Sequence, residues 1–297
     1  MAGHALFASC PWATSPRGPR PSGPRCPSIN EVIRYLKKYN DEYIVIKCGG
    51  SVLVDNELFN IFIKDISVLN KLGFIPIIVH GGGKRISNKL NELGIKSNFI
   101  KGLRVTEKET IEVVEQVLIE FNSEIIEALK EQQCDSQTIN SRENNIMTVV
   151  QENTELGFVG TPSNINKSMI DKIVDEKKVP VIAPLGLDEN NQTYNINADT
   201  AAGAIAKKIE ARRLIIMSDV EGVLDSNKKL IPEINSESIN ELINSEIVTG
   251  GMIPKINNCL DVASNGVKGV VIIDGRKNHS LLFELLSDKG SGTLIRQ

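Results

Sequence analysis

Short apolar runs alternate with segments of helical spacing along most of this chain. The apolar runs occupy residues 43–47, 74–79, 179–183, 214–217 and 270–273. The segments with a helical pattern are residues 56–72, 84–93, 107–130 and 198–209. Strands that are apolar at nearly every position are buried on both faces, and the helices that connect them cover those faces. The pattern therefore predicts an α/β fold, a three-layer αβα sandwich with a mainly parallel central sheet.

The composition is that of one large globular unit, and it excludes several kinds of partner. The chain has 297 residues, of which 41% are hydrophobic and 24% are charged, and its formal net charge is −3. That charge provides no general attraction for nucleic acid or anionic lipid. No apolar run reaches the roughly 18 residues of a membrane span. We expect neither a nucleic acid nor a membrane as a partner.

The cysteines are scattered and form no C-x-x-C pair. They are Cys10, Cys26, Cys48, Cys134 and Cys259. This spacing is neither a disulfide framework nor a zinc motif, and it fits a reducing compartment. Cys48 adjoins a glycine pair, so a reactive thiolate is one interpretation, but a small buried apolar side chain is the commoner role. We expect a cytoplasmic protein.

Residues 1–28 differ from the rest of the chain. They contain six of its twelve prolines, three arginines and no acidic residue. Such a segment cannot bury a core, so a disordered leader is expected. Its composition is compatible with a transit peptide for a plastid or another organelle, and equally with a leader that is not native. The folded domain is then residues 29–297.

The ordered part is expected to begin with a helix. Ser28 and Glu31 have the spacing of a capping box, in which each side chain binds the other residue's backbone N–H. Apolar residues at helical spacing follow over residues 29–39. This helix either packs on its own domain or serves as an arm that joins another subunit.

Three glycine-rich loops adjoin the ends of predicted strands or helices, and two of them carry a lysine. They are Lys47-Cys48-Gly49-Gly50, His80-Gly81-Gly82-Gly83 and Gly250-Gly251-Met252-Ile253-Pro254-Lys255. Glycine lets backbone N–H groups approach an anion closely, and lysine adds a point charge. Each loop alone is explained by a tight turn, and none matches a dinucleotide or Walker motif. Together they predict a polyphosphate site, and hence an enzyme that transfers a phosphoryl group.

Three further segments carry candidate ligands. Arg104 precedes a predicted helix, and its guanidinium fork suits a carboxylate, although a solvated surface arginine is the commoner case. Asn195, Asn197 and Asp199 open the alanine-rich helix, where they either cap it or orient a substrate. Residues 217–224 follow a buried strand and provide either groups that bind a nucleotide or a simple turn.

These motifs, together with Gly102-Leu103-Arg104-Val105-Thr106, resemble those of the amino acid kinase family in the same order and over residues 29–297. They are most similar to the members that phosphorylate N-acetylglutamate. The resemblance implies that Lys47 and Lys255 stabilise charge on the transferring phosphoryl group and that Asp199 holds both lysines. It implies that N-acetylglutamate is bound by Gly82, Gly83, Arg104 and Asn195. It assigns ATP binding to Gly49, Gly50, Ser218, Asp219, Val220, Gly222, Val223, Leu224, Gly251, Met252 and Ile253.

By this resemblance the chain would transfer a phosphoryl group from ATP to the γ-carboxylate of N-acetyl-L-glutamate. The product is N-acetyl-L-glutamyl 5-phosphate, in the second step of arginine biosynthesis, and Mg²⁺ would enter with the nucleotide. Residues 29–194 would form the N-terminal helix and acetylglutamate lobe, and residues 195–297 the ATP lobe. The nearest alternatives are sister kinases acting on acetylaminoadipate, glutamate, aspartate, carbamate or uridylate. A regulatory protein that binds nucleotide or arginine without turnover, and a nicotinamide oxidoreductase, are more distant alternatives.

The two ends of the domain resemble those of arginine-sensitive members. The implied arginine site consists of Tyr35, His279, Glu284 and Gly292, although His279 and Glu284 also fit an ordinary helix surface. The implied assembly is a homo-oligomer, either a dimer or a hexamer built through interlaced N-terminal helices. A nitrogen-signalling protein is a further candidate partner.

Two segments depart from the family pattern. Lys84-Arg85 follows the triple glycine where a proline and a polar residue are usual. This adds positive charge near the acceptor loop and leaves the length of the acceptor open. Residues 135–161 are asparagine-rich, and we interpret them as a hairpin flap whose substrate-closing residues the pattern does not identify.

Overall fold

The computed structural model describes residues 27–245, 247–248 and 252–297. Its first helix, α1 (Ile29–Tyr39), begins at the predicted capping box, because the Glu31 N–H donates to the Ser28 hydroxyl at 3.2 Å and the Ser28 N–H donates to the Glu31 carboxylate at 2.7 Å. Of the predicted leader, only residues 27 and 28 are described, so that prediction lies almost wholly outside the described residues.

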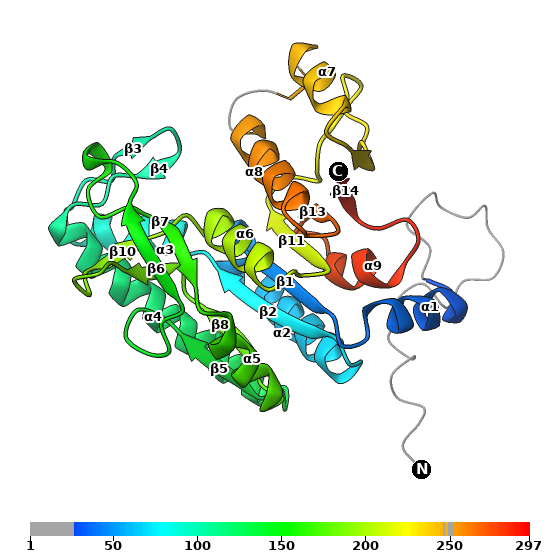
Figure 1. The fold of residues 1–297 in the computed structure, drawn as a ribbon, viewed down its shortest axis with the longest axis horizontal. Coiled ribbons are helices and arrows are strands. Elements are labelled where there is room, and N and C mark those ends of the chain that lie inside the picture. Colours follow the sequence, from blue (N-terminus) through cyan, green and yellow to red (C-terminus); the bar gives the residue numbers. More distant parts are fainter. Residues whose placement is uncertain (1–26, 246, 249–251) are drawn as a thin grey trace.

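An eight-stranded sheet runs through the molecule (Figure 1). Its order is β12-β14-β13-β11-β1-β2-β8-β5. The bounds are β1 (Tyr43–Cys48), β2 (Ile75–His80), β5 (Ser136–Ile139), β8 (Val179–Ile182), β11 (Arg213–Ser218), β12 (Glu233–Ile234), β13 (Val270–Asp274) and β14 (Gly292–Ile295). All neighbours pair in parallel except β13 and β14. This confirms the predicted mainly parallel sheet.

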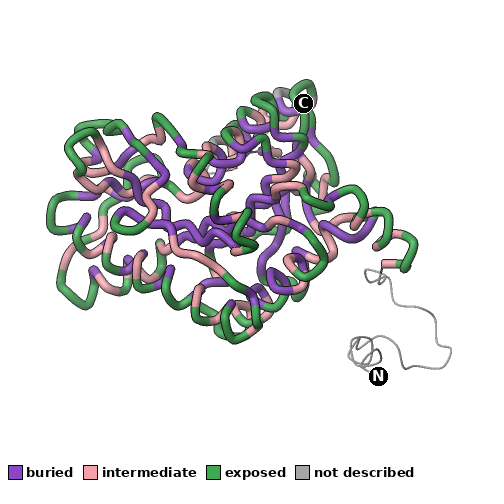
Figure 2. The backbone as a smooth tube through the Cα atoms, turned by 60° about the horizontal axis from the view of Figure 1, so that its bottom comes forward, coloured by how far each residue is buried: buried purple, intermediate pink, exposed green. Residues whose placement is uncertain are grey.

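Helices cover both faces of this sheet because successive residues of each strand point to opposite sides. In β1, Ile44 and Ile46 pack with α2 (Asn56–Lys71), α4 (Lys108–Glu131) and α9 (Ser280–Leu286). Val45 faces the other layer, which contains α5 (Lys167–Asp175), α6 (Ala198–Lys208) and α8 (Met252–Ser264). The central strands are therefore buried on both sides, and the middle of the molecule is purple in Figure 2, the colour of buried residues. The predicted three-layer sandwich is confirmed.

Two smaller sheets lie outside the central one. An antiparallel hairpin joins β3 (Phe99–Ile100) to β4 (Leu103–Arg104), at the opposite end of the molecule from α1 (Figure 1). The second has the order β10-β9-β6-β7, from β6 (Met147–Gln151), β7 (Gly160–Ile165), β9 (Leu185–Leu187) and β10 (Thr193–Asn195). The remaining elements are η1 (Gly50–Leu53), α3 (Gly83–Glu92), η2 (Thr154–Leu156) and α7 (Ser238–Asn244). In the described part of the chain, no helix has the length and apolar character needed to cross a membrane.

The prediction of one hairpin flap over residues 135–161 is wrong at its N-terminal end. Residues 136–139 form β5, which pairs with β8 as the edge strand of the central sheet. The hairpin proper is β6–β7. Between them Asn140 makes a turn, because its side-chain oxygen accepts hydrogen bonds from the N–H groups of Arg142 and Glu143. This turn separates the two strands into different sheets.

Candidate active site

Three neighbouring parallel strands of the central sheet end at the same edge. β1 ends at Cys48 opposite His80 of β2, and β11 ends at Ser218 on the other side of β1. The Gly81 N–H donates to the Cys48 carbonyl at 2.8 Å, so the loops after β1 and β2 are directly joined. In open α/β sheets, ligands bind at this carboxyl edge. The first two predicted glycine loops therefore lie together, whereas Gly250 and Gly251 of the third lie outside the described residues.

Lys47 and Lys255 meet at one carboxylate. Lys47 Nζ, from β1, lies 3.0 Å from Asp199 Oδ1, and Lys255 Nζ, from the start of α8, donates to Asp199 Oδ2 at 2.8 Å. Asp199 lies in the first turn of α6, where the helix dipole favours a negative charge. Burial raises the pKa of Asp199, but the charges of the two lysines outweigh it and lower the pKa to about 2. The ionised carboxylate thus holds both ammonium groups at one point.

The glycine loop after β1 leaves room for these charged groups. A Cβ atom on Gly49 would lie 2.5 Å from Lys47 Nζ, and one on Gly50 would lie 2.5 Å from Asp219 Oδ1. Gly50 also has φ +62, in the left-handed region that other residues rarely adopt. Larger residues at these two positions would push a lysine and an aspartate away from the loop.

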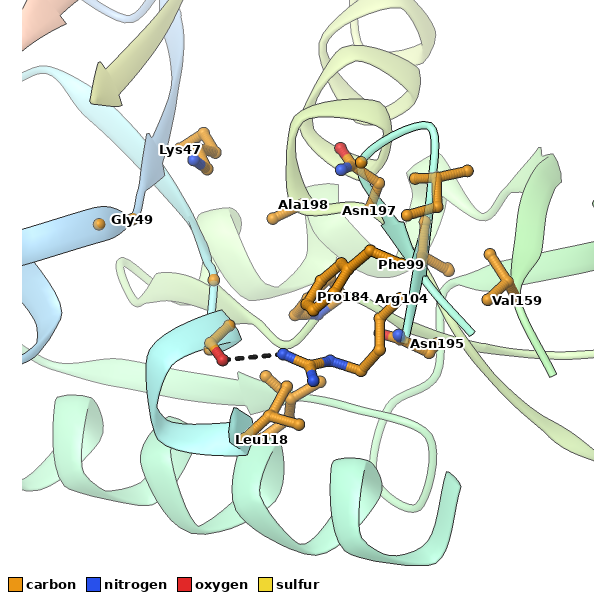
Figure 3. A pocket seen from close by; sticks show the side chains of 18 residues that line it. Lys47, Gly49, Phe99, Arg104, Leu118, Val159, Pro184, Asn195, Asn197 and Ala198 are labelled. Carbon is orange, nitrogen blue, oxygen red and sulfur yellow. Dashed lines mark hydrogen bonds between the residues drawn. The ribbon is translucent and has the colours of Figure 1, made fainter. Parts of the chain in front are cut away.

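A cavity of about 210 Å³ opens beside Lys47 (Figure 3). The four residues predicted to bind the acceptor all line it, namely Gly82, Gly83, Arg104 and Asn195. In Figure 3, Lys47 and Gly49 lie on one side of the cavity, and Arg104 and Asn195 lie on the other. Sites for drug-sized ligands have volumes of roughly 300–1,000 Å³. This smaller cavity suits a small metabolite.

Arg104 is a buried charge whose contacts are all neutral. Its side chain donates to the Gly83 carbonyl at 3.0 Å, to Ser87 Oγ at 2.9 Å and to Ser97 Oγ. The guanidinium also lies over the Phe99 ring, 4.7 Å from its centroid. Burial lowers the pKa of Arg104, and within the described residues no carboxylate pairs with it. A buried charge without a counter-ion favours an anionic ligand.

Asn195 and Asn197 have different roles. Asn197 is the N-cap of α6, because its side-chain oxygen accepts from the N–H groups of Asp199 and Thr200. Asn195, in β10, donates to the buried Thr106 hydroxyl at 3.3 Å and lines the cavity. The capping alternative therefore describes Asn197, while Asp199 faces the lysines. Thr106 was not predicted as part of the site, since a lone threonine before a helix has no distinctive sequence signal.

The segment after β11 lies beside the loop after β1. Asp219 Oδ1 accepts from the Ser51 N–H at 2.8 Å. Burial raises the pKa of Asp219, but hydrogen bonds from Ser51 and the charge of Lys84 outweigh it, so the pKa is lowered. Val220 is exposed, whereas Val223 is buried in the core and its N–H donates to Thr293 Oγ1.

The other predicted ATP-binding residues lie near these two loops or outside the described part. Gly222 has φ +136, and Leu224 forms a bridge with Leu230. Met252 and Ile253 begin α8 and pack against the core, and Gly251 lies outside the described residues. Ser218, Gly49 and Gly50 lie at the edge where β1 and β11 end. That a nucleotide binds between β11, α8 and the Gly49–Gly50 loop stays a prediction.

Lys84 and Arg85 point in different directions. Lys84 Nζ donates to Ser51 Oγ at 3.2 Å and to Asp219 Oδ2 at 3.5 Å. Arg85 Nε donates to the Leu53 carbonyl, and its Nη1 donates to both carboxylate oxygens of Glu124 of α4. Both residues therefore add positive charge near the acceptor loop, as expected, but the charge of Arg85 is paired with Glu124.

His80 belongs to a buried polar network that was not predicted. Asn122 of α4 donates to His80 Nε2 at 3.2 Å and to the Val181 carbonyl at 2.9 Å, while His80 Nδ1 lies 3.0 Å from the Gly81 carbonyl. Thr138 of β5 donates in turn to the Asn122 side-chain oxygen. Burial lowers the pKa of His80 to about 4. The ring is therefore neutral, with Nδ1–H donating into the glycine loop.

The candidate effector residues do not all lie together. The Tyr35 hydroxyl, from α1, donates at 2.9 Å to Asp288, which lies just after α9. Glu284 of α9 accepts from the Ser291 N–H at 2.7 Å. Gly292 begins β14, where a Cβ would lie 1.9 Å from the Ile272 carbonyl oxygen. His279 instead pairs with Asp65 of α2 at 2.7 Å. Three of the four residues thus surround the corner between α1, α9 and β14.

Comparisons with known proteins match this chain to one family and to proteins with a common name. The family model described as amino acid kinase family matches residues 42–274. Acetylglutamate kinase of Pelagibacter ubique (strain HTCC1062) is 72% identical over 271 residues, which cover 91% of this chain and 94% of that protein. Acetylglutamate kinase of Campylobacter fetus subsp. fetus (strain 82-40) is 43% identical over 270 residues, which cover 90% of this chain and 96% of that protein.

A solved structure has the same fold at lower identity. It is N-acetylglutamate synthase from Neisseria gonorrhoeae, complexed with coenzyme A and N-acetyl-glutamate, with a TM-score of 0.82 at 21% identity. The match covers 90% of this chain but only 62% of the synthase, so this chain spans less than two thirds of that protein. At this identity the likeness shows the fold alone.

Proposed function

This chain belongs to the amino acid kinase family, and on that basis we infer that it has acetylglutamate kinase activity and uses ATP to phosphorylate the side-chain carboxylate of N-acetyl-L-glutamate. The reaction belongs to arginine biosynthesis and yields N-acetyl-L-glutamyl 5-phosphate. The observation that carries this inference is the meeting of Lys47 and Lys255 at Asp199, beside a cavity that holds the buried Arg104.

The chemistry requires charge stabilisation more than proton transfer. A glutamyl carboxylate has an ordinary pKa of about 4.3, so it is already ionised and needs no general base. The difficulty is to bring two anions together and to stabilise the charge on the transferring phosphoryl oxygens. We assign that role to Lys47 and Lys255, and we assign to Asp199 the role of fixing their positions. Mg²⁺ would neutralise phosphate charge, and Asp219 offers the kind of oxygen ligand that this ion prefers.

The charges in the cavity support a preference for an N-acylated acceptor. Arg104 would pair with the α-carboxylate, and the Asn195 amide and the N–H groups of Gly82 and Gly83 would bind the remaining polar atoms. Free glutamate carries an ammonium group, which the cations of this site disfavour. Acetylation removes that charge. The same argument applies against aspartate.

The inference is tested by ADP release from ATP with a panel of acceptors. N-acetyl-L-glutamate is expected to exceed glutamate, aspartate and carbamate in kcat/KM by roughly 10²-fold or more, since polar groups of the site stay unpaired with these acceptors. It should exceed acetylaminoadipate, which has the same polar groups and one more methylene, by roughly 10-fold or more. The Asp199→Asn variant provides the background rate. Faster turnover of any other acceptor would assign the chain to a sister kinase. If no acceptor increases the release of ADP, the proposal that this chain phosphorylates a carboxylate is contradicted.

Feedback inhibition by arginine is the second part of the proposal. Glu284 supports it, because burial raises the pKa of this carboxyl and, among the described residues, no cation forms an ion pair with it. A free arginine would supply the missing guanidinium, with Tyr35 and the backbone around Gly292 nearby. In the same assay, arginine should inhibit the wild type, and Glu284→Gln should require roughly 10-fold more arginine at an unchanged basal rate. A flat titration of the wild type up to millimolar arginine contradicts this part.

Assembly into a homo-oligomer fits the exposed apolar side chains of α1. Ile29 is 71% exposed and Ile33 is 45% exposed, on a helix that otherwise packs beside α9. Such side chains are better accommodated against a second copy. A monomeric molar mass in light scattering, both with and without arginine, would contradict assembly.

A further inference from the structure

Lys84 occupies a position that helix stability does not explain. It is the second residue of α3, whose N-cap, Gly82, makes no side-chain capping bond. The first turn contains Lys84 and Arg85 but no acidic residue. The positive end of a helix dipole disfavours cations in exactly this turn, so the lysine there opposes the helix.

The Lys84 ammonium reaches out of α3 to the loops after β1 and β11. Its Nζ lies 3.2 Å from Ser51 Oγ and 3.5 Å from Asp219 Oδ2. The other oxygen of Asp219 accepts from the Ser51 N–H at 2.8 Å. An ammonium group and a backbone N–H therefore bind one carboxylate beside the glycine loop.

Lys47, near the end of β1, extends over the same loop. Lys47 Nζ lies over Gly49, at 2.5 Å from the point where a Cβ of that residue would be, and Lys84 lies beside Ser51. Consecutive Cα atoms are about 3.8 Å apart. Gly49 and Ser51 are only two residues apart, and each has one of the two ammonium groups beside it. The two groups are therefore close enough to contact one polyphosphate chain.

The contact between Lys84 and Asp219 is weak enough to be exchanged. The side chains are 53% and 37% exposed, and ion pairs of this kind contribute only about 0–1 kcal/mol to stability. Lys47 and Lys255, in contrast, lie 3.0 Å and 2.8 Å from a buried carboxylate. A multiply charged phosphate binds an ammonium group more strongly than an exposed carboxylate does.

We propose that Lys84 is a third cation of the phosphoryl-transfer site, which pairs with Asp219 when no nucleotide is bound and donates to a non-bridging oxygen of the β- or γ-phosphate when ATP is bound. The proposal rests on the proposed phosphorylation by ATP and adds a residue to it. This exchange of partners would also release Asp219 from Lys84 when the nucleotide binds. Lys84 directly follows Gly82 and Gly83, which line the proposed acceptor cavity. Its side chain would therefore connect the two substrate sites.

The test uses the full chain and measures nucleotide binding by titration calorimetry without acceptor. The probes are the Mg²⁺ complex of AMP-PNP, which has all three phosphates, and AMP, which has one. Lys84→Gln should weaken binding of AMP-PNP about 10-fold and leave AMP unchanged. Lys84→Arg should keep most of the affinity, because it keeps the charge. The matched control is Lys89→Gln, which removes a lysine of the same helix whose Nζ lies 3.5 Å from Glu92.

Steady-state rates then show which substrate Lys84 serves. In Lys84→Gln the KM for ATP should rise while the KM for N-acetylglutamate stays the same. Unchanged binding of AMP-PNP, an equal loss for AMP and AMP-PNP, or a rise confined to the KM for N-acetylglutamate would each overturn the assignment. A wild type that does not phosphorylate N-acetylglutamate would contradict the proposed function itself. A wild type that does so, with Lys84→Gln unaltered, contradicts only the role of Lys84.

Discussion

Arg104 illustrates how a single side chain can be prepared for a ligand. It is buried, and its hydrogen bonds go to two serine hydroxyls and one carbonyl rather than to a carboxylate. Phe99 covers one face of the guanidinium, which suits arginine better than lysine. The side chain is thus oriented before an anion arrives, and little rotamer entropy remains to be lost on binding.

Arg104→Lys should therefore impair acceptor binding although it keeps the charge. Lysine cannot form the two parallel hydrogen bonds of a guanidinium fork, so the KM for N-acetylglutamate should rise roughly 10-fold or more. The KM for ATP should stay the same, because Arg104 lies on the far side of the cavity from Lys47. Steady-state kinetics with each substrate varied in turn provides the measurement. The control is Arg142→Lys, at an exposed arginine paired with Glu115. Equal effects of the two substitutions would argue against a direct contact of Arg104 with the acceptor.

Three elements, β2, α4 and β5, position the glycine loop that follows β2. His80, at the end of β2, is held through Asn122 of α4 and Thr138 of β5, and it contacts the Gly81 carbonyl. Phe121 packs edge-on against the imidazole, with ring centroids 5.1 Å apart. The network fixes the direction in which the chain leaves β2. Gly82 and Gly83, which follow, then lie against the cavity.

This network makes folding stability dependent on pH. The pKa of His80 is about 4 in the folded protein and about 6.5 when unfolded, so between these values only the unfolded chain takes up the proton. The stability is therefore complete above pH 6.5 and falls as the pH decreases towards 4, by about 3 kcal/mol in total. Urea unfolding at several pH values should show this slope in the wild type and a shallower slope in His80→Gln. Parallel profiles for the two proteins would show that His80 does not titrate in this way.

How much of the fold the sequence predicted depended on how clear the apolar pattern of each element is. The strands β1 and β2 are nearly continuous apolar runs and the long helix α4 has a clear helical spacing, so their predicted bounds agree within one residue or two. Short strands such as β12 and β14 were missed because they contain no continuous apolar run, whereas the four-residue β8 lies in the apolar run that was predicted at residues 179–183. The strand β5 was assigned to a flap because the asparagines after it resemble a hairpin turn, whereas its partner β8 lies far away in the sequence.

For the candidate site, the sequence predicted which residues lie close together better than it predicted side-chain direction. The resemblance to the amino acid kinase family groups Lys47, Asp199 and Lys255, and in the structure they meet. Lys84 and Arg85 were grouped too, but one binds across the sheet edge and the other binds α4. Adjacent residues on a helix point about 100° apart, and only tertiary packing decides what each one meets.

The whole molecule brings distant segments to one edge of a single sheet. Lys47 comes from a central strand, Asp199 from the start of α6 and Lys255 from the start of α8, on the layer that covers one face of that sheet. Removal of one ammonium group leaves Asp199 with a single partner and the transferring phosphoryl with less stabilisation. The two lysines should therefore behave as parts of one unit rather than as independent contributors.

The most direct test of this account is kcat for acetylglutamate phosphorylation in Lys47→Ala, Lys255→Ala and the double variant. Each single substitution should lower kcat by roughly 10²-fold or more, as loss of a preorganised charge donor does. The double variant should lose less than the product of the two single losses, because both lysines stabilise the same transferring group. Wild-type turnover in either single variant, or a double variant that loses the full product, would contradict the convergence of the two lysines on one phosphoryl group.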